Sequence, residues 1–107
     1  MKNIALIPAR GGSKGIKRKN IKLFNKKPLI YWTIETALAS NYIDRVIVST
    51  EDEEIADISR SLCAEVPFMR PASLAQDNTT GIETVLHALE EISDVKNILL
   101  MQPTSPL

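Results

Sequence analysis

The sequence of 107 residues contains one cysteine, Cys63, and this scarcity excludes both an intrachain disulfide and a metal cluster built on cysteines. It also has no apolar run that approaches the roughly 18 residues needed for a membrane span. The first residues, Met1 to Ile4, lead directly into a strand-like segment and lack the apolar stretch of a signal peptide. We therefore expect a cytoplasmic protein, in which Cys63 is a small packing residue.

Acidic residues are missing from the first third of the chain. Nine of the 13 Lys and Arg residues fall within residues 1–27, the first acidic residue is Glu35, and the formal net charge is nevertheless zero. A basic block of this kind indicates an anionic partner, which is either a nucleic acid or a small molecule that carries phosphate. The five aromatic residues do not interleave with the basic run, so stacking of single-stranded nucleic acid is poorly supplied. An RNA-binding module remains an alternative, although we expect nucleic acid not to be the partner.

Buried-strand patterns alternate with helical patterns along the whole chain. Apolar runs predict strands over 3–8, 45–49 and 97–102, and a short edge strand over 65–68 that contains Pro67. Helical spacing predicts helices over 28–40 and 51–63, the second with a capping box at Thr50 and Glu53. A third helix follows a similar box at Thr80 and Glu83, and its predicted apolar face consists of Ile82, Val85, Leu86, Leu89 and Ile92. The segment before Pro28 is predicted to be irregular.

This alternation predicts an α/β fold with a mostly parallel sheet between helices, in a Rossmann-like three-layer α/β/α arrangement. We expect residues 1–107 to form a single nucleotide-binding domain. The last predicted strand ends about five residues before Leu107, although a sheet begun in this way normally continues. We therefore expect this chain to be the N-terminal portion of a longer enzyme.

The glycine-rich loop after the first strand is the strongest candidate for a binding site. It reads Pro8-Ala9-Arg10-Gly11-Gly12-Ser13-Lys14-Gly15 and leaves the sheet at the carboxyl end of a strand, where open α/β sheets bind ligands. Glycines let backbone N–H groups approach a phosphate, and Arg10, Lys14 and Ser13 add charge and a hydroxyl donor. The loop has neither Walker A nor dinucleotide-fold spacing, and a solvated turn is the alternative interpretation.

Three other segments are weaker candidates when each is taken alone. The run Lys17 to Asn20 is either a solvated charged face or a contact to a triphosphate and its ribose. The segment from Arg70 to Gly81 offers an arginine, but Asp77 and Thr80 would serve equally as helix caps. Gln102 is the last residue of the final predicted strand and has the donor and acceptor groups that a sugar requires. His87 has no second histidine for a metal site, and we expect it at the surface or its boundary.

Taken in order, these segments resemble the acylneuraminate cytidylyltransferase (CMP-sialic acid synthetase) family. The matching pieces are Ile7 to Gly15, Lys19-Asn20, Val48 to Thr50, Arg70-Pro71, Leu74-Ala75, Asp77 and Leu100 to Leu107. The resemblance covers essentially the whole chain, whereas members of the family run to roughly twice this length. Many relatives carry a proline just before the lysine that Lys19 matches, where this chain has Lys17-Arg18.

The resemblance implies a fold of the nucleotide-diphospho-sugar transferase type and an activity. Such enzymes transfer CMP from CTP to a sialic-acid-like nine-carbon keto acid and release pyrophosphate; they need Mg²⁺ and usually work as homodimers. The resemblance implies that the cytosine is met by the backbone of Pro8 and Ala9, by Arg70, and by Thr79, Thr80 and Gly81, with Asp77 in the same motif.

The resemblance further implies that the phosphates are held by Arg10, Gly11, Gly12, Ser13, Lys14 and Lys19. Of these, Arg10, Lys14 and Lys19 would promote the reaction. Asn20 would bind the ribose, and Gln102 would meet the acceptor. Most magnesium ligands are expected outside this chain, and alone it is expected to bind nucleotide weakly with little or no catalysis. A related transferase that uses another base or keto sugar, or a non-catalytic nucleotide-binding module, is the alternative.

Overall fold

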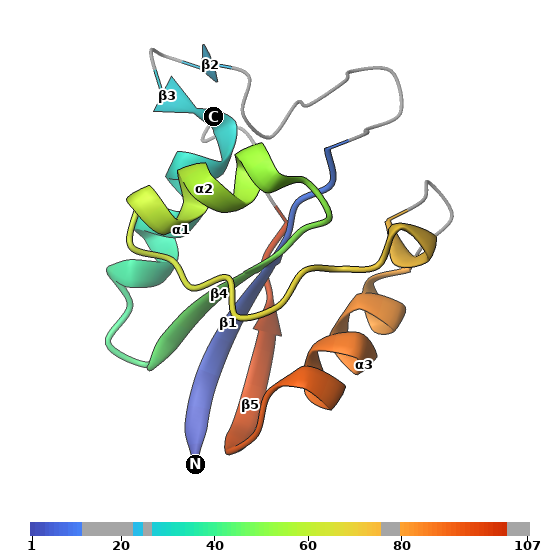
Figure 1. Cartoon of the computed structure of the whole chain (residues 1–107). Coiled ribbons are helices and arrows are strands. Elements are labelled where there is room, and N and C mark those ends of the chain that lie inside the picture. Colours follow the sequence, from blue (N-terminus) through green and yellow to red (C-terminus); the bar gives the residue numbers. More distant parts are fainter. Residues whose placement is uncertain (12–22, 25–26, 76–79, 103–107) are drawn as a thin grey trace.

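The computed structural model describes residues 1–11, 23–24, 27–75 and 80–102 of the chain. A parallel sheet forms its centre, in the order β4-β1-β5. These strands are β1 (Lys2–Pro8), β4 (Arg45–Ser49) and β5 (Val95–Leu100). Figure 1 shows all three running toward the same edge of the sheet, with helices on both faces. The predicted α/β architecture with a parallel sheet is confirmed.

Burial explains why β1 is the central strand. Ile4, Ala5, Leu6 and Ile7 are fully buried, because β4 and β5 pair with its two edges and helices cover its two faces. A continuous apolar run of this kind is typical of a strand inside a parallel sheet. The edge strand expected near Pro67 is reduced to a single parallel bridge between Ile47 and Glu65.

Helices α1 (Leu29–Leu38) and α2 (Glu53–Ser61) pack on one face of the sheet. Helix α1 buries Ile30, Ile34 and Ala37 against β1 and β4, as its spacing predicts. The predicted cap of α2 is wrong by two residues. Asp52, not Thr50, is the N-cap, and its carboxylate accepts hydrogen bonds from the N–H groups of Glu54 (2.9 Å) and Ile55 (3.1 Å).

Helix α3 (Gly81–Glu91) covers the opposite face, and its capping is as predicted. The hydroxyl of Thr80 accepts a hydrogen bond from Glu83 N–H at 3.1 Å. The predicted apolar face is largely wrong, because Ile82, Leu86 and Leu89 are exposed in the described structure. The residues that α3 buries are instead Thr84, His87 and Ala88.

Smaller side chains on α3 allow the helix to approach the sheet closely. A Cβ atom on Gly81 would lie 2.8 Å from Leu100 Cδ2, and Ala88 is fully buried beside Ile4, Leu6 and Ile47. His87 is 8% exposed and stacks edge to face on Phe68 at 5.2 Å, so the surface position expected for it is wrong.

Two local expectations also need correction. The segment predicted to be irregular before Pro28 contains two short antiparallel strands, β2 (Leu23–Phe24) and β3 (Lys27–Pro28). Cys63 is exposed with φ of 73°, in the turn after α2, so it is not a packing residue. The segment after Arg70 includes a 3-10 helix, η1 (Ala72–Leu74). Among the described residues no helix is long and apolar enough to cross a membrane.

Candidate functional site

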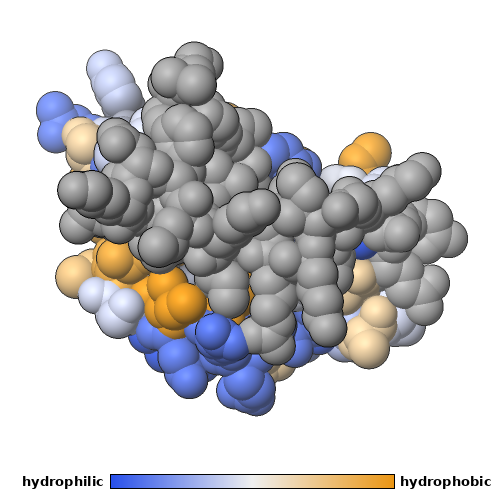
Figure 2. All heavy atoms as spheres, turned by 90° about the horizontal axis from the view of Figure 1, so that it is seen from above, coloured by the Kyte–Doolittle hydropathy of each residue, from blue (hydrophilic) through white to orange (hydrophobic). Residues whose placement is uncertain are grey.

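The candidate site lies at the edge of the sheet where β1, β4 and β5 end. From β1 the chain moves outward through α1 to β4, and it returns through α3 to β5 on the other side of β1. Ligands of open α/β sheets bind where the strand order reverses in this way, outside the carboxyl ends of the strands. Figure 2 looks down on this end of the molecule and shows hydrophilic and hydrophobic side chains around its rim.

The turn after β1 is held tightly against the end of β4. Ala9 is fully buried, and its N–H donates to the carbonyl oxygen of Ser49 at 2.9 Å. The next residue, Arg10, is half-buried. Because the Ala9 N–H is already donated and Pro8 has none, these two residues can offer a ligand only backbone carbonyl oxygens.

Gly11 lies against the first residues of the loop after β4. Its N–H donates to both carboxylate oxygens of Glu51, and the contact to Oε2 is 3.2 Å. A Cβ atom at Gly11 would lie 3.0 Å from both Cβ and Cγ of Asp52, which caps α2. Only glycine therefore fits here without moving the cap. The backbone donor that was expected to serve a phosphate is bonded to a carboxylate of the chain itself.

The side chain of Arg70 joins the end of β4 to the segment around Leu74 through hydrogen bonds. Its side chain is 4% exposed; Nε donates to Ser49 Oγ (3.0 Å) and Nη2 to the Ser49 carbonyl oxygen (2.8 Å). Nη1 donates to the carbonyl oxygen of Leu74 at 3.1 Å. Three of the five guanidinium N–H groups are thus used to fix the loop, and two remain for other partners.

The charges around Arg70 show that the β1 turn and the β4 loop meet beside it. Burial lowers the pKa of Arg70, the carboxylate of Glu51 raises it, and the guanidinium of Arg10 lowers it again. Arg10 and Glu51 therefore both act electrostatically on Arg70, although the three residues are up to 60 positions apart in sequence. We call these three residues the charged triad.

Thr80, Gly81 and Gln102 lie on the β5 side of the same edge. Gly81 begins α3 in contact with Leu100, and Met101 N–H donates to the carbonyl oxygen of Leu6 at 2.9 Å. Gln102 follows and is exposed, as a residue that meets a substrate must be. Thr80 is a helix cap, which was one of its two interpretations.

Seven predicted site residues lie outside the described part of the chain. They are Gly12, Ser13, Lys14, Lys19, Asn20, Asp77 and Thr79. Glu51 is the residue that sequence reasoning missed. The available signal was an acidic residue directly after a buried strand, but its partner Gly11 is 40 positions away.

Metal binding finds little support in the described ranges. No group of three or more His, Cys, Asp or Glu side chains comes together there. Glu51 and Asp52 are neighbours, but Glu51 bonds Gly11 and Asp52 caps α2. Mg²⁺ sites in nucleotide enzymes use one or two carboxylates together with substrate phosphates, and in the described ranges Glu51 and Asp52 already accept backbone N–H groups.

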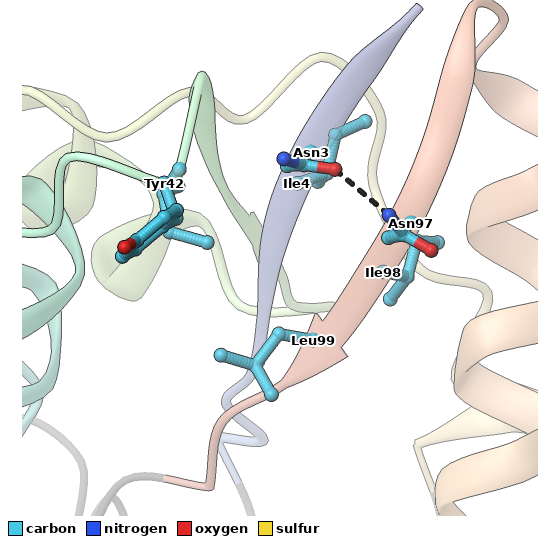
Figure 3. Close-up of a pocket in the computed structure, with 7 residues that line it drawn as sticks. Asn3, Ile4, Tyr42, Asn97, Ile98 and Leu99 are labelled. Carbon is cyan, nitrogen blue, oxygen red and sulfur yellow. Dashed lines mark hydrogen bonds between the residues drawn. The ribbon is translucent and has the colours of Figure 1, made fainter.

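A separate hollow of about 260 Å³ lies away from the triad, beside the loop after α1. Figure 3 shows Tyr42 on one side of it and the amides of Asn3 and Asn97 on the other, joined by a hydrogen bond of 3.0 Å. The remaining lining consists of Ile4, Ile43, Ile98 and Leu99. Because none of these side chains carries a charge, the hollow does not suit a phosphate group.

Known proteins resemble this chain over nearly its whole length. The profile of the cytidylyltransferase family matches residues 4–107. The N-acylneuraminate cytidylyltransferase of Escherichia coli O18:K1:H7 is 44% identical over 105 residues, which are 98% of this chain and 25% of the relative. A pseudaminic acid cytidylyltransferase of Campylobacter jejuni is 44% identical over 98 residues, 92% of this chain and 42% of the relative. The CMP-N,N'-diacetyllegionaminic acid synthase of Legionella pneumophila is 41% identical over an alignment of 110 residues, gaps included, which covers 99% of this chain and 47% of the relative.

A solved structure supports the fold. A CMP:2-keto-3-deoxy-manno-octonic acid synthetase in complex with CTP superimposes with a TM-score of 0.84 at 22% identity, covering 99% of this chain and 42% of that one. At that identity the likeness concerns the fold. The chain spans between about a quarter and a half of the length of the relatives described above.

Proposed function

This chain belongs to the cytidylyltransferase family, and on that premise we propose that it is the nucleotide-binding part of an enzyme that transfers CMP from CTP to a sialic-acid-like nine-carbon keto acid. The acceptor hydroxyl attacks the α-phosphate in line, the bond to the β-phosphate breaks, and pyrophosphate leaves. Little covalent chemistry falls to the protein, so positioning and charge neutralisation supply most of the rate.

The observation that carries this proposal is that the turn after β1 and Arg70 meet at the carboxyl edge of the sheet, where the Ala9 N–H and Arg70 Nη2 both donate to the Ser49 carbonyl oxygen. The described charged side chains at this edge are the guanidinium groups of Arg10 and Arg70 and the carboxylates of Glu51 and Asp52, so the positive charge of the proposed site depends on Lys14 and Lys19. Arg10 would stabilise charge on the phosphates, together with Lys14 and Lys19. Asn20, Ser13 and Gly12 complete the proposed nucleotide contacts.

The backbone at the end of β1 favours a base with an amino group. Pro8 and Ala9 offer carbonyl oxygens, which accept hydrogen bonds, and the N4 amino group of cytosine is a donor. Uracil has a carbonyl oxygen at that position, so two acceptors would face each other. We propose that Arg70, Asp77 and the Thr79 to Gly81 turn complete the base site.

The acceptor is proposed only as a class of sugar. Relatives of nearly equal identity are named for N-acylneuraminate, pseudaminic acid and diacetyllegionaminic acid. All three names belong to acidic nine-carbon keto sugars, and Gln102 offers the amide that would hydrogen-bond such an acceptor. A homodimer and a place in glycan biosynthesis belong to the same proposal.

Magnesium is part of the proposed reaction, but the described residues do not provide its site. The ion would neutralise phosphate charge during transfer.

Thermal unfolding with different nucleotides tests the proposal. CTP at a hundred times its Kd should stabilise the protein by about 2.7 kcal/mol, whereas GTP, ATP and UTP at the same concentration should stabilise it less. The measurement is the unfolding midpoint with each nucleotide and Mg²⁺. Protection by GTP without protection by CTP would show that the base assignment is wrong.

A further inference from the structure

The carboxylate of Glu51 contacts the turn after β1, where the proposed anionic substrate would meet negative charge. Its two oxygens accept the N–H of Gly11, the first glycine of the loop. The same carboxylate attracts Arg70, whose side chain is almost completely buried. The Glu51 side chain therefore contacts the turn after β1 and acts electrostatically on Arg70, which follows the bridge between Ile47 and Glu65.

We propose that Glu51 is a positioning residue that holds the glycine turn after β1 against the loop after β4 before nucleotide binds. The proposal rests on the nucleotide site described above, and it adds Glu51 to that site. As a positioning residue, Glu51 does not itself contact the substrate. It fixes the direction in which the chain leaves Gly11, and with it the place of Arg10.

The surroundings of Glu51 indicate that its carboxylate stays bonded to the turn after β1 and is not displaced by the substrate. Its backbone follows Thr50, which is fully buried, and precedes Asp52, whose carboxylate caps α2. If the carboxylate moved away, Arg70 would lose the acidic group that attracts it and would keep the repulsion of Arg10. Release would also break the contacts of Glu51 to the Gly11 N–H, so the described hydrogen bonds oppose it.

Two substitutions separate the hydrogen bond from the charge. Glu51→Gln keeps an oxygen that accepts the Gly11 N–H, whereas Glu51→Ala removes the acceptor. Glu53→Gln is the matched control, because Glu53 is an exposed acid two residues further along. Thermal melts of all variants establish that each is folded.

The first readout is the amide resonance of Gly11 in ¹H–¹⁵N spectra of the unliganded protein. A hydrogen bond to a carboxylate moves the amide proton downfield, so Glu51→Ala should move it upfield and Glu51→Gln should move it less. The control should leave it unchanged. An unchanged Gly11 resonance in Glu51→Ala would overturn the link between Glu51 and the turn.

The second readout is calorimetric titration with CTP and with inorganic tripolyphosphate. Loss of a charge-assisted contact predicts that Glu51→Ala weakens both ligands about tenfold, and that Glu51→Gln stays within about threefold of the unmodified protein. Equal binding by Glu51→Ala would overturn the positioning role, and tighter binding by both variants would instead identify Glu51 as an internal competitor. If the unmodified protein bound neither ligand, the proposed function would fail, while the Gly11 resonance would still decide the structural link.

Discussion

At the scale of single residues, Arg10 and Arg70 have the same charge but different surroundings. Arg70 is buried and donates three hydrogen bonds to Ser49 and Leu74, so its first task is to hold two loops together. Arg10 is half-buried at the tip of the β1 turn. The residue type and loop position suggested ligand contact for both, and the three-dimensional contacts show in addition that Arg70 joins two loops of the chain.

Arg10→Ala should lower the cytidylyl-transfer activity of an enzyme that contains this chain by a hundredfold or more. The reason is the loss of about 3 kcal/mol of charge stabilisation at the phosphates. The measurement is steady-state kcat/KM with CTP. Lys96→Ala is the matched control, because Lys96 is an exposed cation at the start of β5, far from the triad. Near-normal kinetics in a folded Arg10→Ala enzyme would refute the role given to Arg10.

At the scale of elements, two strands of the central sheet were predicted closely, whereas β5 spans 95–100 instead of 97–102 and the strand expected over 65–68 is a single bridge. The strand over 45–49 is found as predicted, and β1 differs only at its first residue, because continuous apolar runs have little freedom in a parallel sheet. The face of α3 was not predictable in the same way. Its large apolar residues recur at helical spacing, yet the helix packs through the smaller Thr84 and Ala88, together with His87. The position of Gly81 against Leu100 sets this close approach, and no local pattern encodes it.

Substitutions on α3 should therefore contradict the hydrophobic pattern. In this chain Leu86→Gln should change the free energy of unfolding by less than about 0.5 kcal/mol, because Leu86 is 56% exposed. Ala88→Gln should destabilise the fold by about 1–3 kcal/mol, since a larger polar side chain must enter a filled space. Urea denaturation of the two variants measures the difference. A larger loss for Leu86→Gln than for Ala88→Gln would mean that the helix is rotated from the position described.

The candidate site was predictable in its location but not in its internal contacts. The glycine-rich loop and Arg70 follow predicted strands and Gln102 ends one, so their common edge followed from parallel topology. The bond from Gly11 to Glu51 joins loops 40 residues apart, and its existence depends on how closely β1 and β4 pair. Sequence spacing carries no information about that distance, which is why Glu51 was assigned only to the start of a helix.

At the scale of the whole molecule, the distribution of charge separates the two classes of anionic partner. The net charge is zero, but nine of the 13 basic residues lie within residues 1–27. A basic block can attract any polyanion weakly, whereas a nucleotide site has a defined stoichiometry and a preference for one base. Oligonucleotide binding by the basic block alone should weaken steeply as salt rises, because phosphate contacts release counterions.

We expect that a short single-stranded RNA binds only weakly at physiological salt and that free CTP displaces what is bound. Competition follows because the basic residues near the β1 turn would serve both ligands, while the base and triphosphate contacts favour CTP. The measurement is a gel shift over a series of salt concentrations, with and without CTP, and with tripolyphosphate to control for charge alone. RNA binding that resists CTP and tripolyphosphate would place the RNA outside the triad and favour a nucleic-acid-binding module. Displacement by CTP at concentrations where tripolyphosphate has no effect would require a pocket for the nucleoside, because phosphate charge is common to both competitors and only CTP carries ribose and cytosine.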